Sequence, residues 1–254
     1  MLNYKLYQGD CLEVMKDIPD KSIDMILCDL PYGVTRNNWD SEISLDALWE
    51  QYIRIIKDNG AICLFADGMF MAKLMMSNPK MWRYNLVWNK VLASGFLNAN
   101  RMPLRSTEEI VVFYKKQPIY NPQKTKGKPN HSKGKAVGKE SDDETQVNNN
   151  YGNYTIVDNS KELGDMKHPT SLLVFSKPHP SISLHPTEKP VELCEWLIKT
   201  YTNENMTVLD NCMGSGSTGI ACINTNRNFI GIELEEKYFD IAQNRIKEVA
   251  NKTK

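Results

Sequence analysis

Two periodic patterns of apolar residues alternate along the first 115 residues of the chain. Short, almost entirely apolar runs, such as IDMILC at 23–28 and AICLFA at 61–66, are typical of strands buried on both faces. The segment 45–56 instead carries apolar residues at three- and four-residue spacing, which predicts an amphipathic helix ended by Asn59-Gly60. We predict strands over 4–7, 23–28, 61–66, 84–88 and 109–114, and helices beginning near Asp10, over 45–56 and over 68–77. We expect the methionines of 68–77 to fill the core.

The same alternation returns in the last third of the chain. Helical spacing predicts helices over 191–201, 217–225 and 235–250, and apolar runs predict strands over 206–212 and 228–233. Strands that alternate with helices form a largely parallel sheet with helices on both faces. The predicted fold class is therefore α/β.

The middle of the chain has a different composition. From Lys115 to Lys139 there are eight lysines and no acidic residue, and an acidic patch and a polar run follow. Weak periodicity predicts an insertion over 116–180 rather than part of the core. We expect 1–115 and 181–254 to be two halves of one domain.

Composition limits the classes of protein and of ligand to which the chain can be assigned. The 254 residues have a formal net charge of zero, so any attraction to phosphate has to come from local clusters of charge. No stretch resembles a signal peptide or a membrane span. The six cysteines lack metal-ligand spacing, which predicts reduced and mostly buried thiols, no metal site and a cytoplasmic protein.

A glycine-rich turn lies between the predicted strand 206–212 and the helix that follows. Gly214, Gly216 and Gly219 match GxGxxG, and Glu233 stands at the end of the next strand. Such glycines let the backbone approach a nucleotide-like ligand, and the acid can accept hydrogen bonds from ribose hydroxyls. At this point a nicotinamide-dependent dehydrogenase is also consistent with the pattern.

The position of this turn predicts the order of the sheet. After Gly216 too few elements remain to complete a nucleotide-binding sheet, so the other strands have to come from the N-terminal half. The sheet is then circularly permuted. Asp10 and Asp29 are expected on the same carboxyl edge as the glycine turn and Glu233, where open α/β sheets bind ligands.

The motif CDLPYG at 28–33 points to the chemistry of that edge. Pro31 stiffens the backbone, and the Asp29 carboxylate with a free carbonyl makes two acceptors for an exocyclic amino group. The Tyr32 ring offers a face on which a planar base can stack. Acceptors on an aromatic amine stabilise the positive charge that develops when it attacks an electrophile such as a sulfonium methyl group. A nicotinamide has no use for this arrangement.

The order of motifs resembles the beta group of amino-methylating DNA methyltransferases, which use S-adenosylmethionine. In that group an Asp-Pro-Pro-Tyr motif precedes the target-recognition region and the glycine-rich cofactor motif. Here CDLPYG is followed by the basic insertion, by HPTEKP at 185–190, by LDNCMGSGST at 209–218 and by GIELEEKY at 231–238. GDCLEVM at 9–15 resembles the element that binds the adenine of the cofactor. Leu30 replaces the commoner proline, and Cys212 stands where the group often has phenylalanine.

The resemblance implies roles for the matching residues. Asp29 and the backbone of Leu30 and Pro31 would bind the target amino group, and Tyr32 would stack on the extruded base. The residues expected to contact or support the cofactor are Asp10, Cys11, Asp29, His185, Thr187, Lys189, Asp210, Gly214, Ser215, Gly216, Ser217, Thr218 and Glu233. Residues 116–180 would be the target-recognition region.

An aspartate at the first motif position is typical of adenine-N6 enzymes, so the resemblance favours adenine over cytosine N4. The expected partner is double-stranded DNA with the target base flipped out of the duplex. The side chains expected to contact DNA are Trp39, Lys124, Lys126, Lys128, Lys133 and Lys135. A homodimer and a cognate restriction endonuclease are further partners that the resemblance suggests. An RNA amino-methyltransferase and a nicotinamide-binding protein remain as alternatives.

Overall fold

The computed structural model describes residues 3–33, 43–127, 165–177 and 188–252. The chain divides into two compact units, one formed by Met1–Asn121 with Thr170–Lys254 and the other by Pro122–Pro169. In the second unit, β6 (Thr125–Lys126) pairs with β7 (Met166–Lys167) in an antiparallel ladder. The assignment of 116–180 as a target-recognition region stays a prediction.

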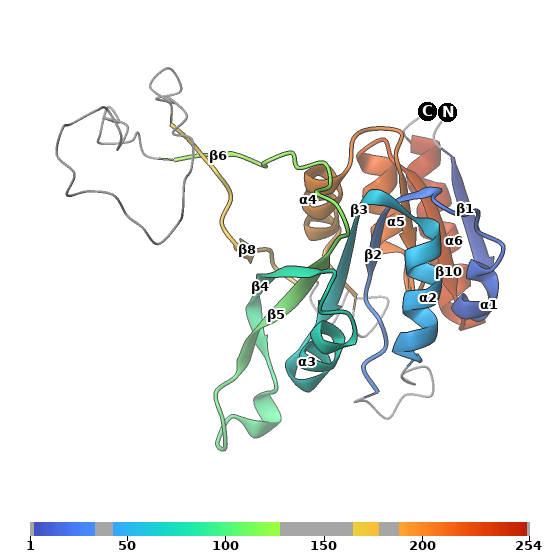
Figure 1. Ribbon diagram of the computed structural model, residues 1–254. Coiled ribbons are helices and arrows are strands. Elements are labelled where there is room, and N and C mark those ends of the chain that lie inside the picture. Colours follow the sequence, from blue (N-terminus) through green and yellow to red (C-terminus); the bar gives the residue numbers. More distant parts are fainter. Residues whose placement is uncertain (1–2, 34–42, 128–164, 178–187, 253–254) are drawn as a thin grey trace. The chain divides into compact units, whose positions relative to one another are not determined.

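The first unit is built on an eight-stranded sheet (Figure 1). In spatial order the strands are β1 (Tyr4–Gln8), β10 (Asn228–Glu233), β9 (Thr207–Asp210), β2 (Ile23–Cys28), β3 (Ile56–Ala66), β5 (Arg105–Phe113), β4 (Trp82–Ser94) and β8 (Leu172–Val174). The ladders from β1 to β3 are parallel, and β5 runs antiparallel to both of its neighbours. The predicted, largely parallel sheet is confirmed.

The order of the strands also confirms the permutation. The first strand pairs with the last, with Tyr4 opposite Phe229 and Gln8 opposite Glu233. The strand before the glycine turn, β9, lies inside the sheet between β10 and β2. The carboxyl ends of β1, β10, β9 and β2 therefore meet at one edge, although their sequences come from both ends of the chain.

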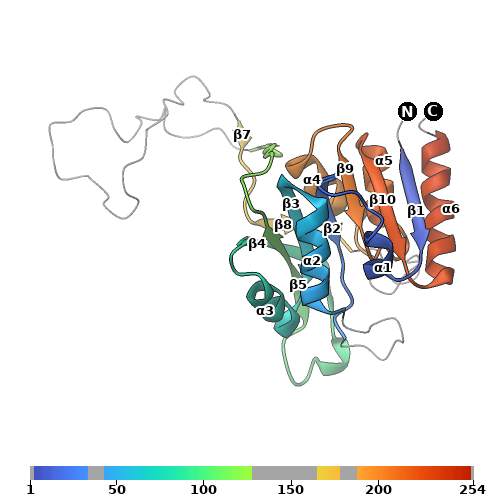
Figure 2. The same ribbon diagram turned by 45° about the vertical axis from the view of Figure 1, so that its right-hand side comes forward.

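Helices cover both faces of the sheet (Figures 1 and 2). One face carries α1 (Cys11–Met15), α2 (Leu45–Ile55) and α3 (Gly68–Ser77), and the other carries α4 (Val191–Tyr201), α5 (Ser217–Asn224) and α6 (Glu236–Lys252). Successive strand residues point to opposite faces, so Met25 and Leu27 pack with the second group of helices while Ile26 and Cys28 pack with the first. This two-sided burial is the reason that β2 is apolar from Met25 to Cys28.

The boundary between α2 and β3 differs from the prediction. The helix ends at Ile55, and Ile56 already pairs with Ile23 of β2. The ladder then becomes irregular, and Gly60 lies within β3, where a Cβ would come 2.9 Å from the Asp24 carbonyl oxygen. The prediction that Asn59-Gly60 ends a helix is therefore wrong, because the glycine is needed for close approach inside the strand.

The methionine-rich helix α3 also corrects an expectation. Its buried side chains are Phe70 and Leu74, while Met69 and Met76 are each 74% exposed. A four-residue step from Phe70 to Leu74 keeps that pair on the inner face, and Met69 and Met76 fall outside it. The methionines at these two positions do not fill the core.

Two further observations concern composition. The six cysteines are free, and all except the half-buried Cys212 are buried, as the sequence predicts. Within the described ranges, no helix combines the length and the apolar character needed to cross a membrane.

Candidate active site

The carboxyl edge of the sheet brings together acids that are far apart in sequence. Asp10 caps α1, and its carboxylate accepts hydrogen bonds from the backbone N–H groups of Leu12 at 2.8 Å and Glu13 at 3.2 Å. The Gly9 N–H donates to the carbonyl of Glu233 at 2.9 Å. The turn at the end of β1 is thus bound directly to the end of β10, as the predicted edge requires.

Glu233 organises the glycine turn. One carboxylate oxygen accepts from the Gly214 N–H at 2.8 Å, and the other accepts from the Glu235 N–H at 2.9 Å. Burial raises the pKa of this carboxyl, and the backbone N–H groups act in the opposite direction. Gly214 and Gly216 have φ of +50° and +84°, which glycine adopts without the strain that a Cβ would add. The turn is therefore held open by an acid that is itself fixed by two donors.

Asp210, at the end of β9, forms hydrogen bonds with residues on both sides of the same turn. It is buried at the end of β9, and one carboxylate oxygen accepts from the Cys212 N–H at 3.2 Å. Burial raises its pKa to about 7, while hydrogen bonds from the Thr218 hydroxyl and the Cys212 N–H act to lower it. Asp210 therefore joins the first turn of α5 to the strand that precedes the glycines.

The segment just before α4 is tied to the glycine turn by Glu188, which sequence reasoning missed. Its carboxylate lies 2.7 Å from an Nη of Arg245, and the Ser217 hydroxyl donates to it at 3.5 Å. The other Nη of Arg245 donates to the Ser215 carbonyl at 2.7 Å. Glu188 and Arg245 thus link the segment before α4 to Ser215 and Ser217 of the glycine turn. The predicted motif HPTEKP contains Glu188, but its spacing gives no sign of Arg245.

The residues of the CDLPYG motif lie at the end of β2. The Tyr32 hydroxyl donates to one oxygen of Asp29 at 2.9 Å, and the Lys189 Nζ lies 2.5 Å from the other. The Tyr32 ring stacks on Phe70 of α3 with centroids 4.7 Å apart. The side chain of Leu30 is buried in the core, and Pro31 is partly buried. Asp29, Tyr32 and Lys189 therefore form one hydrogen-bonded group.

Electrostatics of this group reflect burial and charge together. Burial raises the pKa of Asp29, and the charge of Lys189 opposes that increase. Burial acts to lower the pKa of Lys189, but the carboxylates of Asp29 and Glu108 raise it above its usual range. The ammonium of Lys189 is accordingly kept charged next to the CDLPYG motif.

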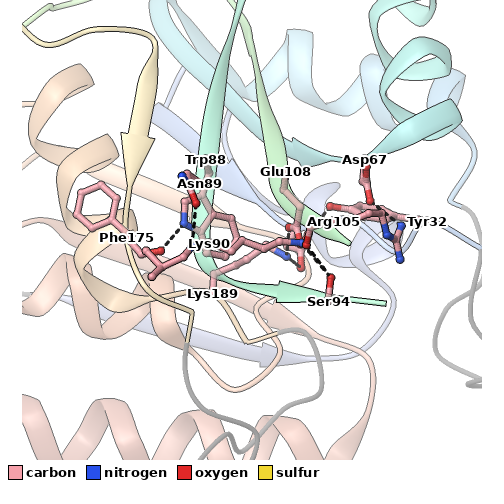
Figure 3. A network of polar contacts seen from close by, with 12 residues as sticks. Tyr32, Asp67, Trp88, Asn89, Lys90, Ser94, Arg105, Glu108, Phe175 and Lys189 are labelled. Carbon is pink, nitrogen blue, oxygen red and sulfur yellow. Dashed lines mark hydrogen bonds and ion pairs between the residues drawn. The ribbon is translucent and has the colours of Figure 1, made fainter. Parts of the chain in front are cut away.

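Two further charged residues reach this group from the hairpin of β4 and β5 (Figure 3). Glu108 of β5 lies 3.5 Å from the Lys189 Nζ and 3.1 Å from the Nζ of Lys90, a residue of β4. Lys90 also donates to the Ser94 hydroxyl at 3.4 Å. Neither Glu108 nor Lys90 belongs to a motif that sequence reasoning could recognise. Register alone brings them to the site.

The other predicted site residues belong to the second unit, to the start of α1 or to segments outside the described residues. Lys124 and Lys126 belong to the second unit, and Lys126 lies 3.3 Å from Asp165. Cys11 is buried at the start of α1. The remaining predicted residues lie outside the described residues, namely Trp39, Lys128, Lys133, Lys135, His185 and Thr187.

Comparisons with known proteins define the class. Residues 23–244 match the DNA methylase family N6_N4_Mtase, and the chain belongs to this family. The type II methyltransferase M.HinfI of Haemophilus influenzae is 25% identical over 96% of this chain and 68% of its own length.

Two solved structures establish the fold. A complex of M1.HpyAVI with S-adenosylmethionine is 24% identical, has a TM-score of 0.64 and covers 96% of this chain and 98% of its own. The PvuII DNA methyltransferase, described as cytosine-N4-specific, is 16% identical, has a TM-score of 0.68 and covers 99% of this chain and 92% of its own.

Membership of the family confirms the predicted enzyme class. The chain is a DNA methyltransferase of the N6/N4 type, and the family uses S-adenosylmethionine, as the sequence predicts. The predicted fold, a Rossmann-like methyltransferase sheet, is confirmed as well.

Proposed function

We propose that this chain transfers a methyl group from S-adenosylmethionine to the N6 amino group of an adenine flipped out of double-stranded DNA. The observation that carries the proposal is the pairing of Asp29 with Tyr32 at the sheet edge that also holds the glycine turn and Glu233. An acceptor for an amino group and a turn suited to a nucleotide-like cofactor are thus parts of one edge.

The residues of the glycine turn fit the cofactor. Each oxygen of Glu233 accepts one backbone N–H, which leaves each with a lone pair that a ribose hydroxyl can use. Gly214 and Gly216 present backbone without side chains, so a ligand can approach it closely. Asp10 and Cys11, at the end of the neighbouring β1, are proposed to meet the adenine moiety. When bound, S-adenosylmethionine supplies an electrophilic methyl group on a sulfonium.

Asp29 is proposed to orient the target amine. Its carboxylate and the nearby backbone carbonyl accept the two amino hydrogens, which localises the nitrogen lone pair toward the methyl group. As the N–C bond formed and the bond between the methyl group and the sulfonium broke, leaving a neutral thioether, the anionic carboxylate would stabilise the positive charge on the nitrogen. Asp29 then accepts the proton that the methylated nitrogen loses and passes it to solvent, so the aromatic amine is restored. Tyr32, already fixed to Asp29, supplies the ring on which the base stacks.

Adenine is proposed because aspartate stands at the first position of the motif. The second candidate is cytosine N4, which has a specific observation behind it. The structural neighbour described as cytosine-N4-specific has a TM-score of 0.68. Both bases present an exocyclic amino group next to a ring nitrogen, so the same acceptors serve either one. The size of the base is the difference that the site has to distinguish.

The test is transfer of a radiolabelled methyl group to duplex DNA, followed by nucleoside analysis. We expect label in N6-methyladenine. Asp29→Ala should abolish transfer and keep cofactor binding in calorimetry. Asp20→Asn is the matched control, because this acid precedes β2 at its opposite end and is paired with Arg54. Label in N4-methylcytosine would establish the second candidate.

Another outcome of the same test excludes the proposal. Label in RNA but not in DNA would favour an RNA amino-methyltransferase.

The relative M.HinfI is described as a type II methyltransferase, and we propose that this chain is also a methyltransferase of that type. Methylome sequencing of DNA from a host that expresses the chain would read out the recognition sequence. The homodimer, the cognate endonuclease and the DNA contacts of residues 116–180 stay predictions.

A further inference from the structure

Four charged side chains form a neutral cluster beside the catalytic motif. Asp29 follows β2, Lys90 and Glu108 come from the hairpin of β4 and β5, and Lys189 precedes α4. Their side chains expose 20%, 5%, 18% and 10% of their surface, in that order. Charges this deeply placed are tolerated only when they are paired, so the two acids and two lysines depend on one another.

The cluster is asymmetric around Lys189. Its Nζ lies 2.5 Å from an oxygen of Asp29 but 3.5 Å from Oε2 of Glu108. Among the described residues, Oε2 of Glu108 is the buried side-chain oxygen or nitrogen without a hydrogen-bond partner, since the contact at 3.5 Å is too long to be a good one. A second acceptor for the ammonium is therefore present, one ångström farther from Nζ than the Asp29 oxygen and about 0.3 Å beyond good hydrogen-bonding distance.

Glu108 is fixed in position and ionised by its contacts with Lys90 and Lys189. Lys90 is within 3.1 Å of its other oxygen, and the backbone of Lys90 is fixed by the Lys177 N–H, which donates to its carbonyl at 3.2 Å. Burial acts to raise the pKa of Glu108, but the charges of Lys189 and Lys90 lower it below the usual range. Glu108 is thus an anion with one oxygen occupied and the other facing Lys189 (Figure 3).

The proposed reaction brings a further donor to Asp29. Each carboxylate oxygen already accepts from one donor, Tyr32 on one and the Lys189 ammonium at 2.5 Å from the other. A target amino group that takes the position of the Lys189 ammonium displaces it, and this ammonium has an alternative acceptor in Glu108. A buried ammonium released without a partner would be costly.

We propose that Glu108 is a positioning residue, which receives the Lys189 ammonium from Asp29 when the amino group of the flipped base binds. This inference rests on the proposed function, because it takes Asp29 as the acceptor of the target amine. Lys189 occupies the place of the amine in the free enzyme and keeps Asp29 paired and ionised. Glu108 makes the exchange possible by keeping the displaced ammonium paired throughout.

The test compares Glu108→Gln with Glu108→Asp and with the matched control Glu109→Gln, the adjacent acid on β5. We expect Glu108→Gln to raise KM for duplex DNA about tenfold or more, because the uncharged amide cannot compete with Asp29 for the ammonium. Fluorescence of 2-aminopurine at the target position should report less base extrusion at equal DNA concentration. Glu108→Asp keeps the charge and should recover most of the loss, and Glu109→Gln should resemble the wild type.

A double-mutant cycle separates positioning from a structural role. In a Lys189→Met background there is no ammonium to receive, so adding Glu108→Gln should change KM by less than about twofold. A purely structural Glu108 would give the same loss in both backgrounds and would also lower cofactor affinity in calorimetry. We expect that affinity to be unchanged.

The pH profile gives a second readout. The groups that act on Asp29 are Lys189, Glu108 and Tyr32, and the negative charge of Glu108 acts to raise its pKa. Activity requires ionised Asp29, so Glu108→Gln should move the acidic limb of the profile to lower pH even as KM rises. A wild-type KM in Glu108→Gln, or equal losses in the two backgrounds, would overturn this inference alone. Absence of methyl transfer by the wild type would instead overturn the proposed function, and the inference with it.

Discussion

Replacing Gly219 with alanine tests why the third glycine of the turn motif is needed. Gly219 lies in α5 where this helix packs between β10 and α6. A Cβ at this position would come 2.4 Å from Cδ1 of Ile246 and 2.7 Å from Cε1 of Phe229. Both neighbours are buried, so neither can move aside into solvent. The substitution therefore forces the helix or its neighbours to shift.

Two opposing free energies decide the result. Alanine is a better helix former than glycine by about 1 kcal/mol, which alone would stabilise α5. Overpacking a well-packed core costs about 1–3 kcal/mol. With contacts as short as 2.4 Å, we place the cost in the upper half of that range, which leaves a net loss of about 1–2 kcal/mol. For a chain of this size the melting temperature should fall by about 2–4 °C for each kcal/mol lost.

Urea denaturation and thermal unfolding of Gly219→Ala measure this loss. Ile246→Val removes the atom nearest to the new Cβ and alone should cost about 0.5–1.5 kcal/mol. The double variant should be more stable than the sum of the two single losses by about 0.5 kcal/mol or more. If Gly219→Ala were as stable as the wild type, or if the two losses simply added, close packing would not be the reason for the glycine.

Three further predictions concern the supports of the site. Burial raises the pKa of Asp210 to about 7, against about 4 for an exposed aspartate. The folded state therefore favours the protonated carboxyl. The free energy of unfolding should fall by about 4 kcal/mol at most as the pH rises from about 4 to 7. Asp210→Asn should remove this pH dependence. The prediction would be contradicted if the difference in urea midpoint between the wild type and the variant did not vary with pH. Glu233→Gln leaves one backbone donor facing an amide N–H, and calorimetry should show cofactor affinity reduced about tenfold or more, because hydrogen bonds to charged groups contribute about 1.5–3 kcal/mol. Tyr52→Phe removes the 2.5 Å hydrogen bond to Asn211 and leaves its buried amide oxygen without this donor. The free energy of unfolding should fall by about 1–3 kcal/mol. An unchanged urea midpoint would show that the hydrogen bond is dispensable.

The site is predictable from sequence where its residues belong to local motifs. Asp29 and Tyr32 are three residues apart, and the glycines of the turn lie within one strand–turn–helix unit, so chain connectivity alone brings the members of each motif together. The rule that parallel strands share a carboxyl edge then joins the motifs to one another. For this reason Asp10, Asp29 and Glu233 could be expected at one edge before any coordinates were known.

Residues brought in by register could not be predicted in the same way. Glu108 reaches Lys189 because β5 runs antiparallel to β3 and β4, and Lys90 reaches Glu108 because of the pairing within that hairpin. A shift of one residue in either ladder would turn these side chains to the opposite face. Nothing in the spacing of the sequence encodes that register, which depends on how the whole sheet packs.

The alternation of strands and helices, the permuted order and the two local motifs could be predicted before the fold was known, because they follow from periodicity and from connectivity. Long-range packing is the reason that Gly60 lies inside a strand, that Phe70 rather than Met69 is buried, and that Glu108 lies next to Lys189. These depend on contacts between segments far apart in the chain, whose free energies override local propensity.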